Sequence, residues 1–498
     1  MGSTFGGLNT ALTSLYAQRR GLDVTGQNIA NASTEGYTRQ RVVMQSQNAN
    51  LVPGVYATTS AVGNGVTVSS VQRLRNTALD QRSFTEHANS AYHNERAGAY
   101  ALIEDVFGEP SDTALQARLQ DMWDGWNAVA ANPDKLAPKS ALLEQATTVA
   151  ATLNDAAAAL DRQYTATRSG LDTYAGEVNK TADSIAKLNQ EIVVATAAGL
   201  QANELQDQRG QQILKLSEMI GATATELPNG AISVYVGSAP LVSEFSTRKI
   251  GFPDGSALKL GDLRSTDVDL QWSDTKAPVG AGGAMGAQVE LLTKGGTLDA
   301  MATRLNGIAQ TLARTVNEIH LDGYGTDVDG THGVNFFMPK NPAADPLNPD
   351  PEVNPLIHEQ VTAENIRVNQ SLLADPHKIA VSSGNPAAAV AADRVLDGTV
   401  ADTLSELSTS RQGADAAYQS LIGDLGVSAQ SSIRRRDIQN AVTDQVDAAR
   451  DAESGVNLDE EMTNLLTYQR GYEAASRVLT TIDSMLDQLI NRTGLVGR

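Results

Sequence analysis

Residues 456–495 read VNLDEEMTNLLTYQRGYEAASRVLTTIDSMLDQLINRTGL, and a repeat of seven runs through them. One set of positions spaced by seven holds Leu458, Leu465, Tyr472, Leu479 and Leu486. The positions three residues further on hold Glu461, Tyr468, Ala475, Ile482 and Leu489. Apolar residues at these a and d positions form a stripe along one side of a helix, and such a stripe packs against a partner helix. The sequence therefore predicts a long C-terminal helix with one face in contact with another helix.

The partner helix is predicted at the opposite end of the chain. A helix is expected from about Ser3 to Asn31, and the same spacing of seven recurs in Leu8, Leu15, Leu22 and Ile29. Periodicity alone leaves open whether the two stripes pack within one chain or between copies. The N-terminal stripe is thin, with Gln18 at a d position, which favours additional packing against copies of the same chain. We therefore expect both termini to share one coiled-coil domain.

Composition limits the classes of protein that fit. A chain of 498 residues exceeds one hydrophobic core, and its net charge of −20 argues against binding to nucleic acid. There are no cysteines, which excludes disulfides and thiolate chemistry. No apolar run is long enough for membrane insertion, and the N-terminus lacks the pattern of a cleaved secretory signal peptide.

The middle of the chain changes character twice. Helical patterns dominate residues 76–220, and short alternating segments with a hairpin signal at Asn229-Gly230 dominate residues 221–290. The predicted fold is α+β and multidomain: terminal coiled-coil helices and a long helical bundle domain with a central β-rich insertion. The expected division is residues 1–75 with 425–498 as the core domain, 76–220 with 291–424 as the helical domain (irregular at 322–364), and 221–290 as the β-rich outer domain.

Residues that could carry chemistry are few. Asp327, Asp329 and His332 resemble the start of a calcium loop, but the sixth position lacks glycine and the twelfth is Met338 rather than Glu, so a polar turn is the better interpretation. The six histidines form no metal-binding motif, and no nucleophile or phosphate-binding motif is present. We expect no catalytic residue, no metal and no cofactor, and therefore not an enzyme.

Two terminal motifs carry a resemblance. Residues 28–40, NIANASTEGYTRQ, resemble the N-terminal motif of the axial proteins of the bacterial flagellum, through Asn28, Asn31, Thr34, Gly36, Tyr37, Arg39 and Gln40. Residues 454–479, SGVNLDEEMTNLLTYQRGYEAASRVL, resemble the family of the first hook-associated protein, which joins hook to filament. Hook and rod proteins share the Tyr468-Gln469 portion but seldom the acidic lead before it.

This resemblance implies a structural adaptor in the extracellular flagellum, exported unfolded by the flagellar type III apparatus without a cleaved signal peptide. The implied partners are further copies in a ring or short helical layer, the hook protein, a second junction protein and filament subunits. A cytoplasmic export chaperone is implied to cover the C-terminal stripe before export, at Leu465, Tyr468, Tyr472, Leu479 and Ile482.

Three alternatives stay open on sequence grounds. The first is a hook or distal-rod protein, which the acidic lead at Asp459, Glu460 and Glu461 disfavours. The second is a peptidoglycan-cleaving enzyme, which the aromatic-poor centre of the chain disfavours. The third is an adhesin that binds a ligand through residues 221–290.

Overall fold

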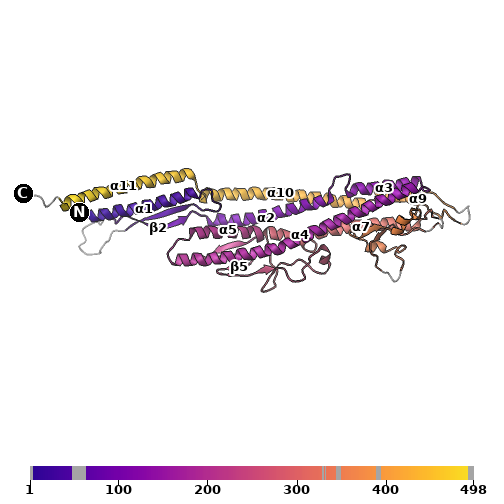
Figure 1. Cartoon of the computed structure of the whole chain (residues 1–498), viewed down its shortest axis with the longest axis horizontal. Coiled ribbons are helices and arrows are strands. Elements are labelled where there is room, and N and C mark those ends of the chain that lie inside the picture. The colour runs from indigo at the N-terminus through magenta and orange to yellow at the C-terminus, as the bar shows by residue number, and fades with distance from the viewer. Residues whose placement is uncertain are drawn as a thin grey trace, which may run out of the picture.

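Both termini lie at the same end of an elongated molecule in the computed structural model (Figure 1). The structure describes residues 4–47, 63–327, 330, 332–343, 349–388 and 394–491, with the backbone alone at residues 4, 5, 489 and 491. Long helices run along the molecule, and the small sheets lie on the flanks of these helices (Figure 1). The predicted fold class is confirmed: terminal helices, a helical bundle and a central β-rich insertion.

The terminal unit consists of α1 (Thr4–Ala30), β1 (Gln40–Ser46), β2 (Val66–Arg73) and α11 (Leu458–Asn491). The two helices pack together, and the β1–β2 hairpin packs on α1. The strands pair antiparallel with a register shift between Val43 and Met44. The terminal unit thus joins segments that lie more than 380 residues apart in the sequence.

The helical bundle consists mainly of six helices. They are α2 (Thr77–Phe107), α3 (Leu115–Ala131), α4 (Leu136–Ala197), α5 (Asn203–Ile220), α7 (Thr297–Asp322) and α10 (Ala414–Ser454). Their ends follow local signals: the Asn76 side chain caps α2 by accepting from two backbone N–H groups, and Gly108 ends it in a left-handed conformation. Helix α3 begins after Ala114, which provides no side-chain cap, and the Ser111 hydroxyl ahead of it accepts from the Thr113 N–H.

Helix α10 defines where the bundle ends. It runs unbroken for 41 residues and continues through Gly423 and Gly426. It packs along α2 and ends at Ser454, and residues 455–457 connect it to α11. The domain border expected at residue 425 therefore lies inside a continuous helix.

The β-rich insertion follows α5. A four-stranded sheet has the order β3 (Thr223–Glu226), β4 (Ile232–Val236), β5 (Ala239–Ser243) and β6 (Ser246–Thr247). Gly230, in the hairpin turn expected at Asn229-Gly230, has a φ of 84°. A second pair joins β7 (Ile250–Gly251) to β8 (Gln271–Trp272), with the 3-10 helix η1 (Leu260–Arg264) between them. The insertion is shorter than predicted, because α6 (Gly283–Leu292) is helical.

The remaining elements cover the end of the bundle that lies far from the termini (Figure 1). They are β9 (Phe337–Pro339), η2 (Ile357–Gln360), β10 (Ile366–Val368), α8 (Gln370–Ala374), η3 (Pro376–Lys378), α9 (Thr399–Ser405) and η5 (Glu406–Thr409). Strands β9 and β10 pair antiparallel; β9 lies within the region 322–364 that was expected to be irregular, and β10 follows just after it. In the suspected calcium loop, His332 forms a β-bridge with Tyr324 and their rings lie 4.2 Å apart, while Asp329 lies outside the described residues.

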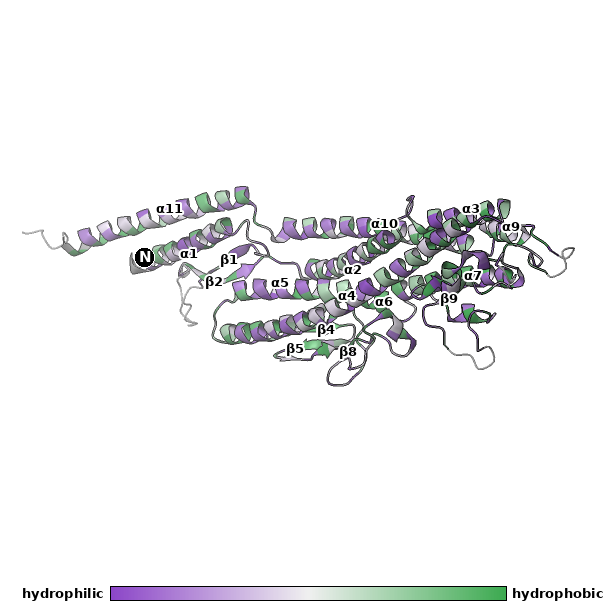
Figure 2. Cartoon of the chain, turned by 45° about the vertical axis from the view of Figure 1, so that its right-hand side comes forward, coloured by the Kyte–Doolittle hydropathy of each residue, from purple (hydrophilic) through white to green (hydrophobic). Residues whose placement is uncertain are grey.

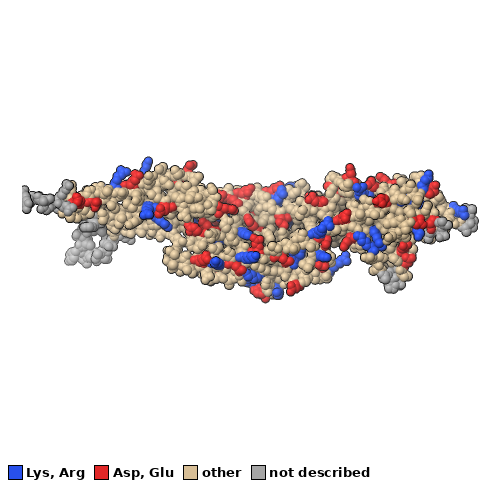
Figure 3. Space-filling model, viewed as in Figure 1, with Lys and Arg blue, Asp and Glu red and all other residues tan. Residues whose placement is uncertain are grey.

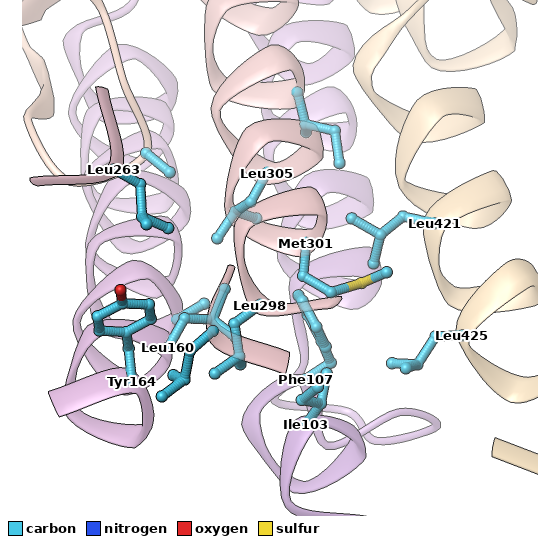
Figure 4. Packing of buried hydrophobic residues seen from close by; sticks show 14 of the residues in the cluster. Ile103, Phe107, Leu160, Tyr164, Leu263, Leu298, Met301, Leu305, Leu421 and Leu425 are labelled. Carbon is cyan, nitrogen blue, oxygen red and sulfur yellow. The ribbon is translucent and has the colours of Figure 1, made fainter. Parts of the chain in front are cut away.

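Two hydrophobic cores hold the chain together. The large one runs through the bundle and the β-rich insertion, and Figure 4 shows Ile103 and Phe107 of α2 close to Met301 of α7 and Leu421 and Leu425 of α10. The small one lies in the terminal unit and consists of Val24, Val42 and Val71, with Met44 and Val68 packed against them. None of the buried residues assigned to the large core comes from α1, β1, β2 or α11. The terminal unit therefore has little hydrophobic burial of its own.

Candidate functional site at the base of the terminal helix pair

Helices α1 and α11 lie antiparallel and approach closely where glycines face bulky side chains. A Cβ atom on Gly21 would lie 2.7 Å from the Tyr468 ring, and one on Gly471 would lie 2.7 Å from the Gln18 side chain. Near the tip of the pair, a Cβ on Gly7 would meet Ile482 at 3.3 Å. Absence of a side chain at these glycines lets the larger side chains of the facing helix fill the contact.

The predicted stripes lie largely between these two helices of one chain. The half-buried members are Leu8, Leu15, Leu22, Ile29, Leu465, Tyr468, Leu479, Ile482 and Leu486. Leu458 and Tyr472 are 52% and 36% exposed, and the Leu489 side chain lies outside the described residues. The most buried positions of the two helices are small or polar, among them Ala11, Thr25, Asn28, Glu461 and Ala475.

Other apolar side chains on the same helices face solvent, together with two members of the predicted stripe. The full set is Leu12, Tyr16, Leu458, Met462, Leu466, Tyr472, Val478, Met485 and Ile490, which we call the outer stripe. Figure 2 shows hydrophobic residues along the length of α11, which projects from the bundle. Exposed apolar surface concentrated on one pair of helices indicates an interaction surface.

Asn28 is the first residue of the N-terminal motif and is almost fully buried. Its side-chain amide donates to the Gln40 carbonyl at 2.9 Å and to Glu461 Oε2 at 3.0 Å. Its Oδ1 accepts from the Gln40 N–H at 3.0 Å and from the Tyr37 hydroxyl at 2.9 Å. One amide thus fixes the end of α1, the start of β1 and the first turn of α11 relative to each other.

Arg39 completes this network through an ion pair with α11. Its guanidinium lies 2.7 Å from Glu461 Oε1 and 2.6 Å from Glu460 Oε2, and its backbone N–H donates to the Ser454 carbonyl. The Glu461 side chain is 2% exposed, so the pair is buried on that side, whereas Glu460 is 59% exposed. Partial burial acts against the charge, but the hydrogen bonds and charges of the two carboxylates raise the pKa of Arg39 above its ordinary value.

Tyr37 is surrounded by carboxylates. Burial, reinforced by the negative charges of Asp207, Glu204 and Glu461, raises the pKa of Tyr37 to about 12. The phenol therefore stays protonated and acts as a hydrogen-bond donor. The remaining motif residues shape the turn: the Thr34 hydroxyl donates to Asn31 Oδ1, and Gly36 has a φ of 76°.

The terminal unit docks on the first two turns of α5 through polar contacts. Asn203 donates to Gln40 Oε1 at 3.0 Å and to the Val71 carbonyl at 3.2 Å. Asp207 accepts from the Thr38 N–H at 3.1 Å and pairs with Arg73 at 2.7 Å. Hydrogen bonds and ion pairs, rather than a shared core, thus connect the two parts of the molecule.

Sequence reasoning found the motif but not its partners. The α5 residues Asn203, Glu204 and Asp207 were not predicted, because nothing local marks them as neighbours of the N-terminal turn. Glu461 was placed at a d position of the stripe and in the acidic lead of the C-terminal helix, but it was not paired with Arg39. A carboxylate at a d position is costly unless it is paired, and this was the available signal for a buried ion pair.

A polar cavity of about 720 Å³ lies beside this network, lined by the turn 32–39, His87, Gln211 and the end of α10. In the described part of the chain, no three His, Asp or Glu side chains are grouped as a metal site would require. No helix within the described ranges is both long and apolar enough to cross a membrane. Figure 3 shows acidic and basic side chains interspersed over the visible face of the bundle.

Comparison with known proteins gives matches along the whole chain. The model of the flagellar hook-associated protein FlgK helical domain matches residues 100–337. The model of a flagellar basal body rod protein matches residues 8–38, and that of the rod FlgEFG protein C-terminal region matches residues 451–492. These two rod-type matches coincide with α1 and its motif, and with the end of α10 and α11.

Full-length relatives agree with these matches. Flagellar hook-associated protein 1 of Bacillus subtilis is 28% identical over 534 residues, with all of both chains covered. The protein of the same name from Escherichia coli is 23% identical, with 97% of this chain and 99% of the relative covered. The solved structure of the flagellar hook junction protein FlgK from Burkholderia pseudomallei superposes with a TM-score of 0.57 at 14% identity, over 75% of this chain and 99% of that one.

Proposed function

Because the chain belongs to the family of flagellar hook-associated protein 1, whose members are structural proteins of the flagellum, we propose that it joins the hook to the filament. It does so as an adaptor, without catalysis, by self-assembly of its terminal helices into a ring or short helical layer. The observation that carries this proposal is the terminal unit: a thin helix pair with a small core and an exposed outer stripe.

Self-assembly uses a different face from the contact within the chain. The predicted a and d stripe is largely occupied by the α1–α11 contact, so the outer stripe is the surface left for neighbouring subunits. Full burial of an exposed Leu or Met side chain contributes about 1.5–3 kcal/mol, and the Leu and Met side chains of the outer stripe on α11 are about half exposed, so each contributes roughly 1 kcal/mol and several per subunit stabilise a layer of copies. The rod-type matches support this assignment, since axial proteins that stack on one another share these two segments.

The proposed partners contact the layer that the terminal helices form. Copies of the chain pack laterally, the hook protein contacts one side of the layer, and a second junction protein followed by filament subunits contacts the other. The acidic lead of α11 and the match to the FlgK helical domain favour the junction over the alternative role in the hook or distal rod.

We also propose how the chain reaches the flagellum. The chain travels unfolded through the flagellar type III apparatus without a cleaved signal peptide, and a cytoplasmic chaperone holds α11 beforehand. Leu465, Tyr468, Leu479 and Ile482 lose their cover when α1 is unfolded, and Tyr472 beside them is already 36% exposed. A chaperone on these residues prevents premature association through the same surface.

The domain division is also a proposal, with two borders revised. The terminal core domain comprises residues 1–75 and 458–498, because α10 packs on α2 up to Ser454. The β-rich outer domain spans about residues 221–282, since α6 begins at Gly283. The helical domain takes the remainder.

The test separates folding from assembly. Leu466 and Met485 are 50% and 52% exposed, so the double variant Leu466→Asp/Met485→Asp should fold normally as a monomer but leave cells without attached filaments. Leu102→Asp on α2, at a side chain that is 57% exposed, is the matched control and should leave filaments intact. Leu479→Asp places a charge in the α1–α11 contact and should block assembly while the bundle stays folded. Normal filaments on cells that carry only the Leu479→Asp chain would refute the assembly role of the helix pair.

A further inference from the structure

His87 connects three helices at the end of the bundle that faces the terminal unit. It lies on α2, and its ring is half-buried in the wall of the polar cavity. Its Nδ1 lies 2.9 Å from Glu218 Oε1 on α5, and its Nε2 lies 2.9 Å from Asp447 Oδ2 on α10. Both ring nitrogens therefore face carboxylate oxygens on different helices.

This geometry fixes the protonation state that the site favours. A carboxylate only accepts hydrogen bonds, whereas a neutral imidazole has one N–H donor and one acceptor nitrogen. A neutral ring would thus leave one nitrogen lone pair directed at a carboxylate. Only the imidazolium, with two N–H donors, satisfies both partners.

We infer that His87 is a proton-dependent clamp that, when charged, fastens the last turns of α10 to α2 and α5. Asp447 lies two turns before Ser454, where α10 ends and the connection to α11 begins. The clamp therefore holds the segment from which the C-terminal helix departs. This inference concerns the bundle itself and stands independently of the proposed junction role.

The other charged groups around His87 do not replace Glu218 and Asp447 as partners of its ring. On α10, Arg450 lies 3.1 Å from Asp80 of α2, and Asp451 lines the same cavity. On α2 itself, Ser83 donates to Asp447 Oδ1, and the Glu86 side chain lies near Arg82. From the turn and α11, Glu35, Arg39 and Glu460 line the cavity, with Arg39 paired to Glu460. The carboxylates of Glu218 and Asp447 remain the groups that face the ring.

The pH dependence has a definite sign. The hydrogen bond to Glu218 outweighs partial burial and, together with Asp447, raises the pKa of His87 above its ordinary value of 6.5. A folded pKa above the unfolded one means that folding favours proton uptake. The contribution of the clamp is therefore fully present below pH 6.5 and is lost as pH rises through the folded pKa.

Two measurements on the full chain test the clamp. The first is NMR titration of protein labelled with ¹³C at histidine Cε1, with the His87 signal assigned by its loss in His87→Gln. It should titrate above 6.5, and Glu218→Gln should move its midpoint downward. The second is hydrogen exchange of residues 439–454, corrected for intrinsic rates, between about pH 6 and about pH 9.

The expected exchange result is a loss of protection at high pH in the wild-type chain and none in His87→Gln. His93→Gln is the matched control on the same helix, because burial and the nearby Arg435 and Arg96 lower the pKa of His93, and it should retain the wild-type profile. A His87 midpoint at or below 6.5, or the same pH profile in His87→Gln as in the wild type, would overturn the inference. Should His87→Gln fail to fold, the His87 signal is identified as the histidine signal whose midpoint lies above 6.5 in the wild type and falls in Glu218→Gln, and the absence of any such signal would overturn the inference.

Discussion

Arg39→Met tests whether the buried ion pair holds α11 in place. The substitution keeps an apolar stem but removes both contacts to Glu461 Oε1, at 2.8 Å from Nε and 2.7 Å from the terminal nitrogen. Glu461 keeps one strong hydrogen bond, from Asn28 at 3.0 Å, and stays 2% exposed. Removal of one partner from a buried pair costs about 3–5 kcal/mol, because the other charge stays desolvated. Arg39 is 17% exposed, so we expect the lower end of this range, about 3 kcal/mol.

Hydrogen exchange measures this loss where it occurs. A local destabilisation of about 3 kcal/mol corresponds to roughly 100-fold faster exchange of amides in the first turns of α11. Amides in the middle of α4 should not change, because the large core does not include the terminal unit. The control is Glu460→Gln, which removes a partner that is 59% exposed and should cost at most about 1 kcal/mol. Equal acceleration in the two variants, or acceleration that spreads through α4, would contradict the reasoning.

Three further predictions concern packing, hydrogen bonding and pH. Gly21→Ala should destabilise the helix pair by about 1–3 kcal/mol, because the added Cβ would lie 2.7 Å from the Tyr468 ring. In Gly26→Ala the added Cβ meets nothing within 4 Å, so this control should be neutral or stabilising when both variants are compared by thermal unfolding. Asn189→Ala removes four hydrogen bonds between α4, α5 and the β-rich insertion, and limited proteolysis should cut residues 223–272 faster while leaving α4 intact. Burial lowers the pKa of His320 to about 4, below its unfolded value, so stability should fall as pH drops from about 6.5 to about 4. Urea unfolding should show this acid sensitivity reduced in His320→Asn, and an unchanged pH profile would contradict it.

Local signals in the sequence predicted the helices well, because each depends on neighbours along the chain. The bounds of α2 follow from a capping residue and a left-handed glycine at its two ends. The heptads at the two termini predicted a pair of helices, and the structure brings these helices together. Helix α6 was missed, since a short apolar helix lacks a clear period.

Only one half of the polar network at the base of the helix pair, the N-terminal motif, could be predicted from the sequence. Its N-terminal motif is contiguous and therefore visible in the sequence. Its partners are not, because Glu461 lies 433 residues from Asn28 and the α5 residues lie more than 160 residues from Gln40. Side chains that meet across such separations depend on the fold rather than on local propensity. The outer stripe was missed for a related reason, since only the structure shows which apolar residues of α11 are already covered by α1.

The location of the protein on the flagellum tests the central claim most directly. Immunogold electron microscopy of intact flagella, with antibody against the β-rich insertion at residues 223–272, gives that location. The account predicts a single band of label where the hook meets the filament. Label along the entire hook, or its absence from flagella, would contradict a junction role.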